Sequence, residues 1–203
     1  MKQILFATTN KSKINDFKEK LFKYNIEVLS LEDLNIKIDV NENGKSAIEN
    51  ALLKVRECKK YTNLPIIGMD DSLFLEGVPE DIQPGLYVRR VSGKTLNDEE
   101  MIDYYTSIVK KYGINGRIDC KWVYGFALID ADRKEYTYSW CIDNFYMVEK
   151  PSNIIKPGYP LNSITKYKEN NKYFDEINDD EKEKLKVDNS DVISFIVDHI
   201  KKR

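Results

Sequence analysis

The chain has 203 residues, 41% of them hydrophobic and 33% charged, and its 32 Lys and Arg against 34 Asp and Glu leave a formal net charge of −2. This length and apolar content suffice for a substantial core, so we expect one domain over residues 1–203. The near balance of charge argues against a broad electrostatic contact with nucleic acid, so no stable nucleic-acid partner is expected and any phosphate recognition must be local.

The first predicted element is a buried strand over residues 3–7, which leads through the polar segment Thr8 to Lys13 into a helix. A helix start exposes unpaired amides and the positive end of the helix dipole, where a phosphate could dock. Lys13 would add charge there, and the side chains of Thr8 and Asn10 would add hydrogen bonds. Such side chains also cap helices when no ligand is near, and this alternative stays open.

A second strand over residues 26–29 and an irregular return over residues 31–40 lead to an acidic turn, residues 41–44. Ser46 and Glu49 then match a capping box, in which each side chain satisfies an orphan helix amide. A helix is therefore expected to begin directly after Ser46.

That helix is predicted to have one apolar and one polar face. Its apolar positions recur at helical spacing and are Ile48, Ala51, Leu52, Val55 and Cys58. Asn50 and Lys54 lie one turn apart, away from this stripe, so a polar face is available to a functional cleft.

A short apolar run over residues 64–69 predicts a buried strand that ends in Asp70, Asp71 and Ser72. Ligands bind at the carboxyl ends of strands in open α/β sheets, and successive side chains point to opposite faces, so only one aspartate can point directly at a given site. We favour Asp71, with Asp70 as the alternative. Glu42 could complete an all-oxygen site suited to Mg²⁺. Asp-Asp-Ser is also ordinary turn chemistry, which stays open.

Residues 74–84 are predicted to be loop, followed by a Pro-Gly turn and an apolar segment that ends in Arg90. An arginine at this place could reach a phosphate or bridge to surface acids. Asn97 and Glu100 form another capping pair, and the helix that they start is expected to end at Gly113.

The segments 120–129 and 135–142 predict a central hairpin, which makes the sheet mixed. Its aromatic residues are Trp122, Tyr124, Tyr136, Tyr138 and Trp140. We favour core packing over base stacking for them, because interleaved basic residues are sparse. Residues 151–163 are expected to be loop and residues 166–186 a solvated charged face, before a last helix capped by Asn189 or Ser190.

The three cysteines, Cys58, Cys120 and Cys141, are far apart and lie within apolar patterns, which favours reduced core residues and a cytoplasmic location. His199 is the only histidine and lies near the end of the last predicted helix, so histidine-based triads and multi-histidine zinc sites are effectively excluded. No run approaches the roughly 20 apolar residues of a membrane span, so no membrane partner is expected.

Four segments occur in one order along the chain: ATTNKSK, ENG followed by IENALLK, MDDS, and PGLYVRR. Together they resemble the inosine triphosphate pyrophosphatase family, called RdgB in bacteria. The resemblance covers about the first half of the chain well and continues loosely to the end. It implies an α/β fold with a long twisted mixed sheet flanked by helices and two lobes around a central cleft.

The resemblance also implies an activity. Members of that family hydrolyse non-standard purine nucleoside triphosphates such as ITP, dITP and XTP to the monophosphate and pyrophosphate, use Mg²⁺ and are commonly homodimers. By motif, Thr8, Asn10 and Lys13 would hold the triphosphate, whereas Glu42 and Asp71 would handle the metal and the attacking water. A carboxylate can orient and deprotonate that water, so the chemistry needs no histidine.

The remaining motif residues complete the implied site. Lys54 would stabilise phosphate charge, and Asp70, Ser72 and Arg90 would line the same cleft. Leu73 departs from the family pattern, because the family has glycine after Asp-Asp-Ser.

The second half of the chain departs further. The family's Gly-Tyr/Trp-Asp-Pro loop for the base becomes residues 158–161, which keep Tyr159 but lack the aspartate. Lys182 matches a family lysine, whereas the family's Ser-His-Arg falls on Lys186-Val187-Asp188. Replacing donors by an apolar residue and an acceptor favours an amino-bearing or modified base, or weak discrimination.

The sequence therefore predicts a Mg²⁺-dependent nucleoside triphosphate pyrophosphatase that acts in nucleotide-pool clean-up. The alternative is a catalytically silent nucleotide-binding or dimeric scaffold protein of the same fold. Glu42, Lys54 and Asp71 favour the enzyme, because a silent relative has no need of that set.

Overall fold

The computed structural model describes residues 1–178, 180–181 and 190–201, and the chain divides into two compact units. Unit 1 consists of Met1–Asp71, Tyr124–Trp140 and Asn189–Arg203, and unit 2 of Ser72–Val123 and Cys141–Asp188. The expected single domain over residues 1–203 stays a prediction. Lys182, the segment 186–188 and the alternative cap Asn189 lie outside the described residues.

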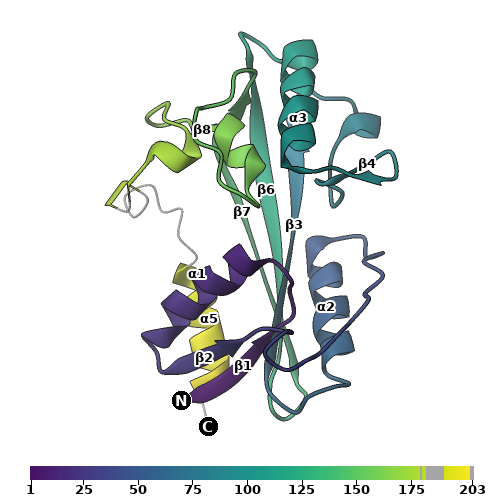
Figure 1. Ribbon diagram of the computed structural model, residues 1–203, viewed down its shortest axis with the longest axis vertical. Coiled ribbons are helices and arrows are strands. Elements are labelled where there is room, and N and C mark those ends of the chain that lie inside the picture. The colour runs from purple at the N-terminus through teal and green to yellow at the C-terminus, as the bar shows by residue number, and fades with distance from the viewer. Residues whose placement is uncertain (179, 182–189, 202–203) are drawn as a thin grey trace. The chain divides into compact units, whose positions relative to one another are not determined.

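Within the described residues, one mixed sheet has the strand order β2-β1-β3-β6-β7-β8 (Figure 1). Its strands are β1 (Lys2–Phe6), β2 (Ile26–Leu29), β3 (Ile66–Leu75), β6 (Arg117–Ile129), β7 (Glu135–Val148) and β8 (Thr165–Tyr167). β1 is parallel to both β2 and β3, whereas β7 is antiparallel to β8. The predicted α/β class and mixed sheet are therefore confirmed.

The helices with described bounds are α1 (Lys11–Phe22), α2 (Ala47–Cys58), α3 (Asp98–Tyr112) and α5 (Ser190–Lys201). A small antiparallel ribbon consists of β4 (Arg90–Val91) and β5 (Lys94–Thr95). Short 3-10 helices occupy Glu80–Ile82, Pro160–Ile164 and Phe174–Glu176. Among the described helices, none combines the length and apolar character that crossing a membrane requires.

Helices cover both faces of the sheet in unit 1 (Figure 1). Ile67 and Met69 of β3 belong to one apolar cluster with α1 and α5, and Ile66 belongs to another with α2. Successive side chains of a strand point to opposite faces, which explains this division. The residues that follow in β3 are therefore presented alternately to α2 and to α1.

Two glycines let α2 lie directly on the strands of unit 1. A Cβ atom at Gly125 of β6 would come within 2.1 Å of the Ile48 backbone nitrogen, and one at Gly68 of β3 would come within 2.7 Å of the Val55 side chain. A Cβ atom at Gly68 would also lie 3.0 Å from the Ala51 carbonyl oxygen. Real Cβ atoms do not come so close to other atoms, so both positions require glycine for this docking. The docking positions the polar side chains of α2 relative to β3.

We expect Gly125→Ala to lower the free energy of unfolding by about 3 kcal/mol, because the added methyl group must push α2 off the sheet. Chemical denaturation of the purified variant measures this change. Gly77→Ala is the matched control: its new Cβ meets no atom within 4 Å, and only its φ of +73° opposes the substitution. The control should lose about 1 kcal/mol. Equal losses in the two variants would contradict the steric argument.

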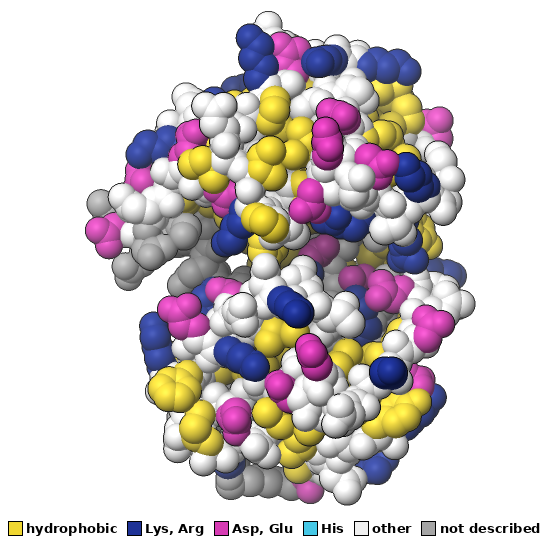
Figure 2. Space-filling model, in the orientation of Figure 1, with side chains coloured by type: hydrophobic (Ala, Val, Ile, Leu, Met, Phe, Trp, Pro, Cys, Tyr) yellow, Lys and Arg dark blue, Asp and Glu magenta, His cyan; other side chains and the backbone are white. Residues whose placement is uncertain are grey.

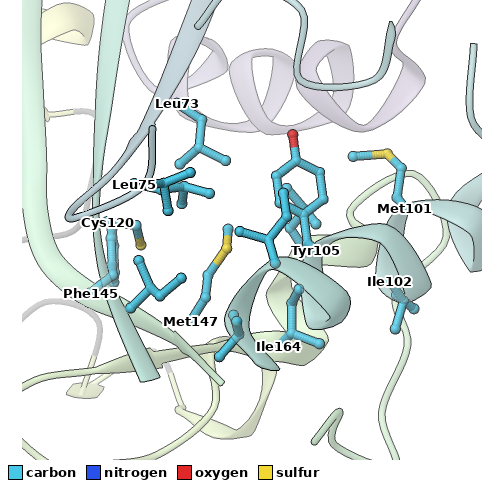
Figure 3. Close-up of a cluster of buried hydrophobic side chains, with 14 of the residues drawn as sticks. Leu73, Leu75, Met101, Ile102, Tyr105, Cys120, Phe145, Met147 and Ile164 are labelled. Atoms are coloured by element: carbon cyan, nitrogen blue, oxygen red, sulfur yellow. The ribbon is translucent and has the colours of Figure 1, made fainter. Parts of the chain in front are cut away.

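One side of α3 packs into the core of unit 2, which includes Tyr105, Leu73 and Leu75, all nearly inaccessible to solvent (Figure 3). The Tyr105 hydroxyl donates a hydrogen bond of 2.8 Å to the Val88 carbonyl, and burial raises the pKa of this phenol. The predicted capping pair is confirmed, because the Asn97 side chain accepts from the Glu100 amide and the Glu100 carboxylate accepts from the Asn97 amide.

The predicted end of this strand at residues 70–72 and the predicted start of the loop at residue 74 are wrong. β3 continues to Leu75, so Asp70, Asp71 and Ser72 lie inside the strand and do not form a turn. Leu73 and Leu75 are the reason, because they alternate into the core of unit 2 and their burial stabilises the extended backbone. The directions of the Asp70 and Asp71 side chains are therefore set by the backbone of a strand and not by a loop.

The predicted hairpin is confirmed in type, but both strands are longer than expected, since β6 begins at Arg117 and β7 ends at Val148. Its aromatic residues pack against the apolar clusters, as predicted.

Cys58 and Cys120 are buried, and burial raises the pKa of both thiols to about 12. Cys141 is exposed, contrary to expectation, because it lies on the outward side of the alternation in β7. Figure 2 shows acidic and basic side chains interspersed over the drawn face.

Candidate active site

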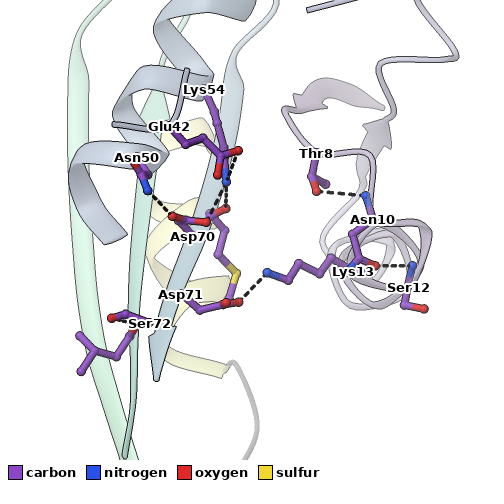
Figure 4. Close-up of polar contacts among 12 residues, drawn as sticks. Thr8, Asn10, Ser12, Lys13, Glu42, Asn50, Lys54, Asp70, Asp71 and Ser72 are labelled. Carbon is purple, nitrogen blue, oxygen red and sulfur yellow. Dashed lines mark hydrogen bonds and ion pairs between the residues drawn. The ribbon is translucent and has the colours of Figure 1, made fainter. Parts of the chain in front are cut away.

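Polar side chains from α1, α2, β3 and the turn before α2 meet in unit 1 (Figure 4). Asp71 of β3 points toward Lys13 of α1, whereas Asp70 points toward Lys54 and Asn50 of α2. The alternation of side chains along β3 produces this separation. The two adjacent aspartates therefore have different environments.

Lys13 forms an ion pair with Asp71, with 2.6 Å between Nζ and Oδ2. Both side chains are about one quarter exposed, at 22% and 25%. Both side chains therefore remain accessible to solvent, and the ion pair fixes their positions relative to each other. An arriving phosphate would compete with Asp71 for the ammonium group, and the aspartate would then lose its counter-ion.

The segment before α1 is a helix cap. The Asn10 side chain accepts hydrogen bonds from the amides of Ser12 and Lys13, at 3.0 and 3.2 Å, and Thr8 Oγ1 accepts from the Asn10 amide at 3.2 Å. The capping role of Asn10 is thus confirmed, whereas the expected contacts of Thr8, Asn10 and Lys13 with a phosphate stay predictions. These bonds fix the conformation of the loop and place Lys13 on the first turn of the helix.

Lys54 lies between two carboxylates. Its ammonium nitrogen is 2.8 Å from Asp70 Oδ1 and 3.3 Å from Glu42 Oε1, and it donates to the Met69 carbonyl at 3.4 Å. The lysine side chain is only 14% exposed. Lys54 therefore joins the acidic turn to β3.

Asn50 is a site residue that the sequence placed on the polar face of the helix but to which it assigned no role. It is completely buried, its amide nitrogen donates to Asp70 Oδ2 at 2.8 Å, and its amide oxygen accepts from the Gly44 amide at 2.9 Å. The signal in the sequence was its place one turn before Lys54 on the polar face of the helix. The cap before it is only partly as predicted: Ser46 accepts from the Glu49 amide, but the Glu49 carboxylate accepts from Lys45.

The donor set of this site is chemically suited to Mg²⁺, which prefers carboxylate oxygens. Glu42, Asp70 and Asp71 carry three formal negative charges against two on Lys13 and Lys54. Within the described residues, no group of three or more His, Cys, Asp or Glu is arranged to hold a metal by itself. Mg²⁺ is commonly bound by one or two carboxylates together with substrate phosphates, and the side chains present fit that mode.

The other predicted site residues belong to unit 2. Ser72 is buried and its hydroxyl donates to the Val123 carbonyl at 3.3 Å, and the guanidinium of Arg90 lies 5.0 Å from the ring centre of Tyr87. Tyr159 directly precedes the 3-10 helix Pro160–Ile164. Their predicted contacts with substrate stay predictions, and Lys182 lies outside the described residues.

The loop that carries Tyr159 is tied to α3. The Gly158 amide donates to Asp98 Oδ2 at 2.9 Å, and Arg89 donates to Asp98 Oδ1 at 2.8 Å. The Gly158 amide, and then Arg89, lower the pKa of the Asp98 carboxyl. Asp98 is thus an anchor of the loop that lacks the aspartate of the resembled family.

A separate recess of about 250 Å³ in unit 1 is lined largely by basic residues of α2 and the β6–β7 hairpin. Its buried Lys59 donates to the carbonyls of Asn63, Leu64 and Asp130, and Arg56 pairs with Glu135 at 2.7 Å. These cations already have partners within the chain. We therefore interpret the recess as a place where α2 is linked to neighbouring segments, and not as a binding site.

Relatives with known names match this chain over part or most of its length. A "dITP/XTP pyrophosphatase" of Oceanobacillus iheyensis is 38% identical over 104 residues, 51% of this chain and 52% of that protein. One of Wigglesworthia glossinidia brevipalpis is 39% identical over 103 residues. In these alignments the chain spans about half the length of the curated relatives it matches. A "dITP/XTP pyrophosphatase" of Bacillus anthracis is 26% identical over 185 residues, 90% of this chain and 88% of that protein.

Solved structures with the same fold include the Ham1 protein of Staphylococcus aureus, with a TM-score of 0.74 and 21% identity over 96% of this chain and 98% of that one. A HAM1 protein from Coxiella burnetii has a TM-score of 0.69 and 22% identity, covering 90% of each chain. The sequence profile of the Ham1 family matches residues 4–188, which include every candidate site residue described above. On this match, which spans most of its length, the chain belongs to the Ham1 family.

Proposed function

We propose that this protein is a nucleoside triphosphate pyrophosphatase that converts non-standard or modified purine nucleoside triphosphates to monophosphate and pyrophosphate in nucleotide-pool clean-up. The observation that carries the proposal is the pairing of two lysines with three carboxylates, Lys13 with Asp71 and Lys54 with Asp70 and Glu42. Phosphoryl transfer needs cations for the phosphates and a carboxylate for the water, and this set supplies both. The printed names of the relatives, dITP/XTP pyrophosphatase, support the same reaction class.

In this reaction Lys13 binds the triphosphate, and Thr8 and Asn10 hold the loop that presents it. The transfer of Lys13 from Asp71 to a phosphate leaves the Asp71 carboxylate free to accept a proton. The water oxygen then forms a bond to one of the two phosphorus atoms that flank the α–β bridging oxygen, and the bond from that phosphorus to the bridging oxygen breaks. The water proton passes to Asp71, and the monophosphate and pyrophosphate leave.

Lys54 keeps two carboxylates close together and adds positive charge near the phosphates. Glu42 and Asp71 would hold Mg²⁺, with Asp70 beside them. When bound, the ion would neutralise phosphate charge and help orient the water. Depletion of divalent cations with a chelator followed by titration of Mg²⁺ tests this assignment.

The most direct test is to incubate the purified protein with Mg²⁺ and a panel of standard, deaminated and modified nucleoside triphosphates, and to measure pyrophosphate and monophosphate. We expect both products in equal amounts from at least one triphosphate. Release of orthophosphate with diphosphate would contradict the proposed bond cleavage. No product from any member of the panel would favour the silent scaffold.

Lys13→Ala should act mainly on triphosphate affinity. A charged hydrogen bond to phosphate is lost, so we expect KM to rise about 10- to 100-fold. Steady-state kinetics with the preferred triphosphate measure this, and the exposed neighbour Lys11 supplies the control Lys11→Ala. An unchanged KM in Lys13→Ala would remove the first loop from the site.

The preferred base follows from the altered second half of the chain. A pocket that selects a 6-oxo purine needs donors aimed at that oxygen, and the loop 158–161 lacks the aspartate of the resembled family. We therefore expect ITP and XTP to have no large advantage over an amino-bearing or modified purine nucleotide. Competition between ITP and each standard triphosphate measures this ratio. A preference of about 100-fold or more for ITP or XTP, ~3 kcal/mol, would contradict the prediction.

The homodimer implied by the family resemblance and the cytoplasmic location expected from reduced cysteines are part of the proposal. Light scattering coupled to size exclusion should give twice the chain mass of 23.8 kDa. A mass of one chain at micromolar concentration would exclude a stable dimer.

A further inference from the structure

The buried amide of Asn50 uses its donor and its acceptor on two different segments of unit 1. Nδ2 donates to Asp70 Oδ2 at 2.8 Å, and Oδ1 accepts from the Gly44 amide at 2.9 Å (Figure 4). The side chain is 0% exposed. A buried amide without partners would cost free energy, so these two bonds restrict its orientation.

The same contacts form a closed circuit. Asn50 holds one oxygen of Asp70, and Lys54 holds the other at 2.8 Å. Lys54 also contacts Glu42 at 3.3 Å, and Glu42 lies two residues before Gly44, whose amide returns to Asn50. Both carboxylate oxygens of Asp70 thus accept hydrogen bonds from residues of α2. The turn that carries Glu42 contacts the same helix twice, through Glu42 to Lys54 and through the Gly44 amide to Asn50.

Close packing keeps this circuit in one geometry. A Cβ atom at Gly44 would lie 2.7 Å from Asn50 Oδ1 and 2.7 Å from Glu49 Cβ, so the turn can approach α2 only with glycine at this position. Gly68 and Gly125 seat the helix itself against the strands. The turn, the helix and β3 are therefore packed closely together where they carry the carboxylates.

We propose that Asn50 is the positioning residue of the active site: it orients Asp70 and holds the Glu42 turn in register with α2. This inference rests on the proposed pyrophosphatase function. Asparagine is suited to the task because it is neutral and offers one donor and one acceptor. Aspartate would keep the acceptor for Gly44 but turn a carboxylate toward Asp70, and leucine would supply neither bond.

The test compares Asn50→Asp, Asn50→Leu and the control Asn43→Asp, which adds the same charge on an exposed position of the turn. Groups that orient ligands or catalytic side chains typically contribute 10- to 100-fold in activity, so we expect kcat to fall about 10- to 100-fold in both Asn50 variants. KM for the triphosphate should change less than about threefold, because Lys13 and its loop are untouched. The control should stay within about twofold of the unmodified protein.

Amide hydrogen exchange supplies a readout that does not depend on activity. Exchange at Gly44 should accelerate in Asn50→Leu, which has no acceptor, and stay slow in Asn50→Asp, which keeps one. A kcat within twofold of the unmodified protein in Asn50→Asp, or equal Gly44 protection in all three variants, would overturn the proposal. If the unmodified protein releases no pyrophosphate, the proposed function fails, while the exchange pattern still decides whether Asn50 holds the turn.

Discussion

Asp71→Asn should reduce pyrophosphate release from the preferred triphosphate by about a thousandfold or more. The substitution removes the charge that a base and a metal ligand need, and leaves the volume of the side chain nearly unchanged. Stability should change by less than about 1 kcal/mol, because the ion pair with Lys13 is partly exposed and such pairs contribute little. Single-turnover kinetics and denaturant unfolding of the same preparation measure the two effects.

Two variants make this result specific. Asp33→Asn removes a surface carboxylate that pairs with Lys18 at 3.4 Å, and it should retain full turnover. Asp70→Asn removes the aspartate whose two oxygens are already engaged by Lys54 and Asn50. If Asp71→Asn keeps near-normal turnover while Asp70→Asn does not, the base is Asp70 and our assignment is wrong.

Lys54→Met should lower the rate of pyrophosphate release by about 10²- to 10³-fold, the usual effect of removing one charged group from an electrostatic site. It should also lower the free energy of unfolding by about 2 kcal/mol. Glu42 and Asp70 would lose the cation that they share, and two partly buried carboxylates would then keep their negative charges without it. The expected result is a variant impaired in both rate and stability, unlike Asp71→Asn.

Lys18→Met is the matched control for this variant. Its ion pair with Asp33 is about half exposed, at 44% and 43%, and is expected to contribute little to stability. Both rate and unfolding midpoint should stay close to those of the unmodified protein. Should Lys54→Met retain a rate within threefold, Lys54 would be a structural bridge and not a group that acts on the phosphates.

Local patterns in the sequence were sufficient to predict most helices and strands. The apolar stripe of α2 was predicted from spacing, and its Ala51, Val55 and Cys58 are fully buried. The start of α3 followed from the capping pair Asn97 and Glu100. Such signals act within one or two helical turns, so the amino-acid order alone determines them.

The ends of the strands were less predictable because they depend on distant packing. Leu73 and Leu75 extend β3 because the core of unit 2 buries them. The polar residues 70–72 before them are equally typical of a turn, so the local sequence did not decide between a turn and a continued strand. Cys141 likewise has an apolar neighbourhood in the sequence, yet the alternation of β7 places it outward. Burial of a strand residue is decided by the elements that cover each face.

The sequence by itself determined which side chains are available to the candidate site, through the order of its motifs and the alternation that separates Asp70 from Asp71. Only the tertiary structure decided the partners: Lys13 from α1 for Asp71, and Lys54 and Asn50 from α2 for Asp70. The physical reason is that α1 and α2 pack against opposite faces of β3. Which face each helix covers cannot be derived from its distance to β3 along the chain. The role of Asn50 in particular exists only because its buried amide meets two segments that the fold brings together.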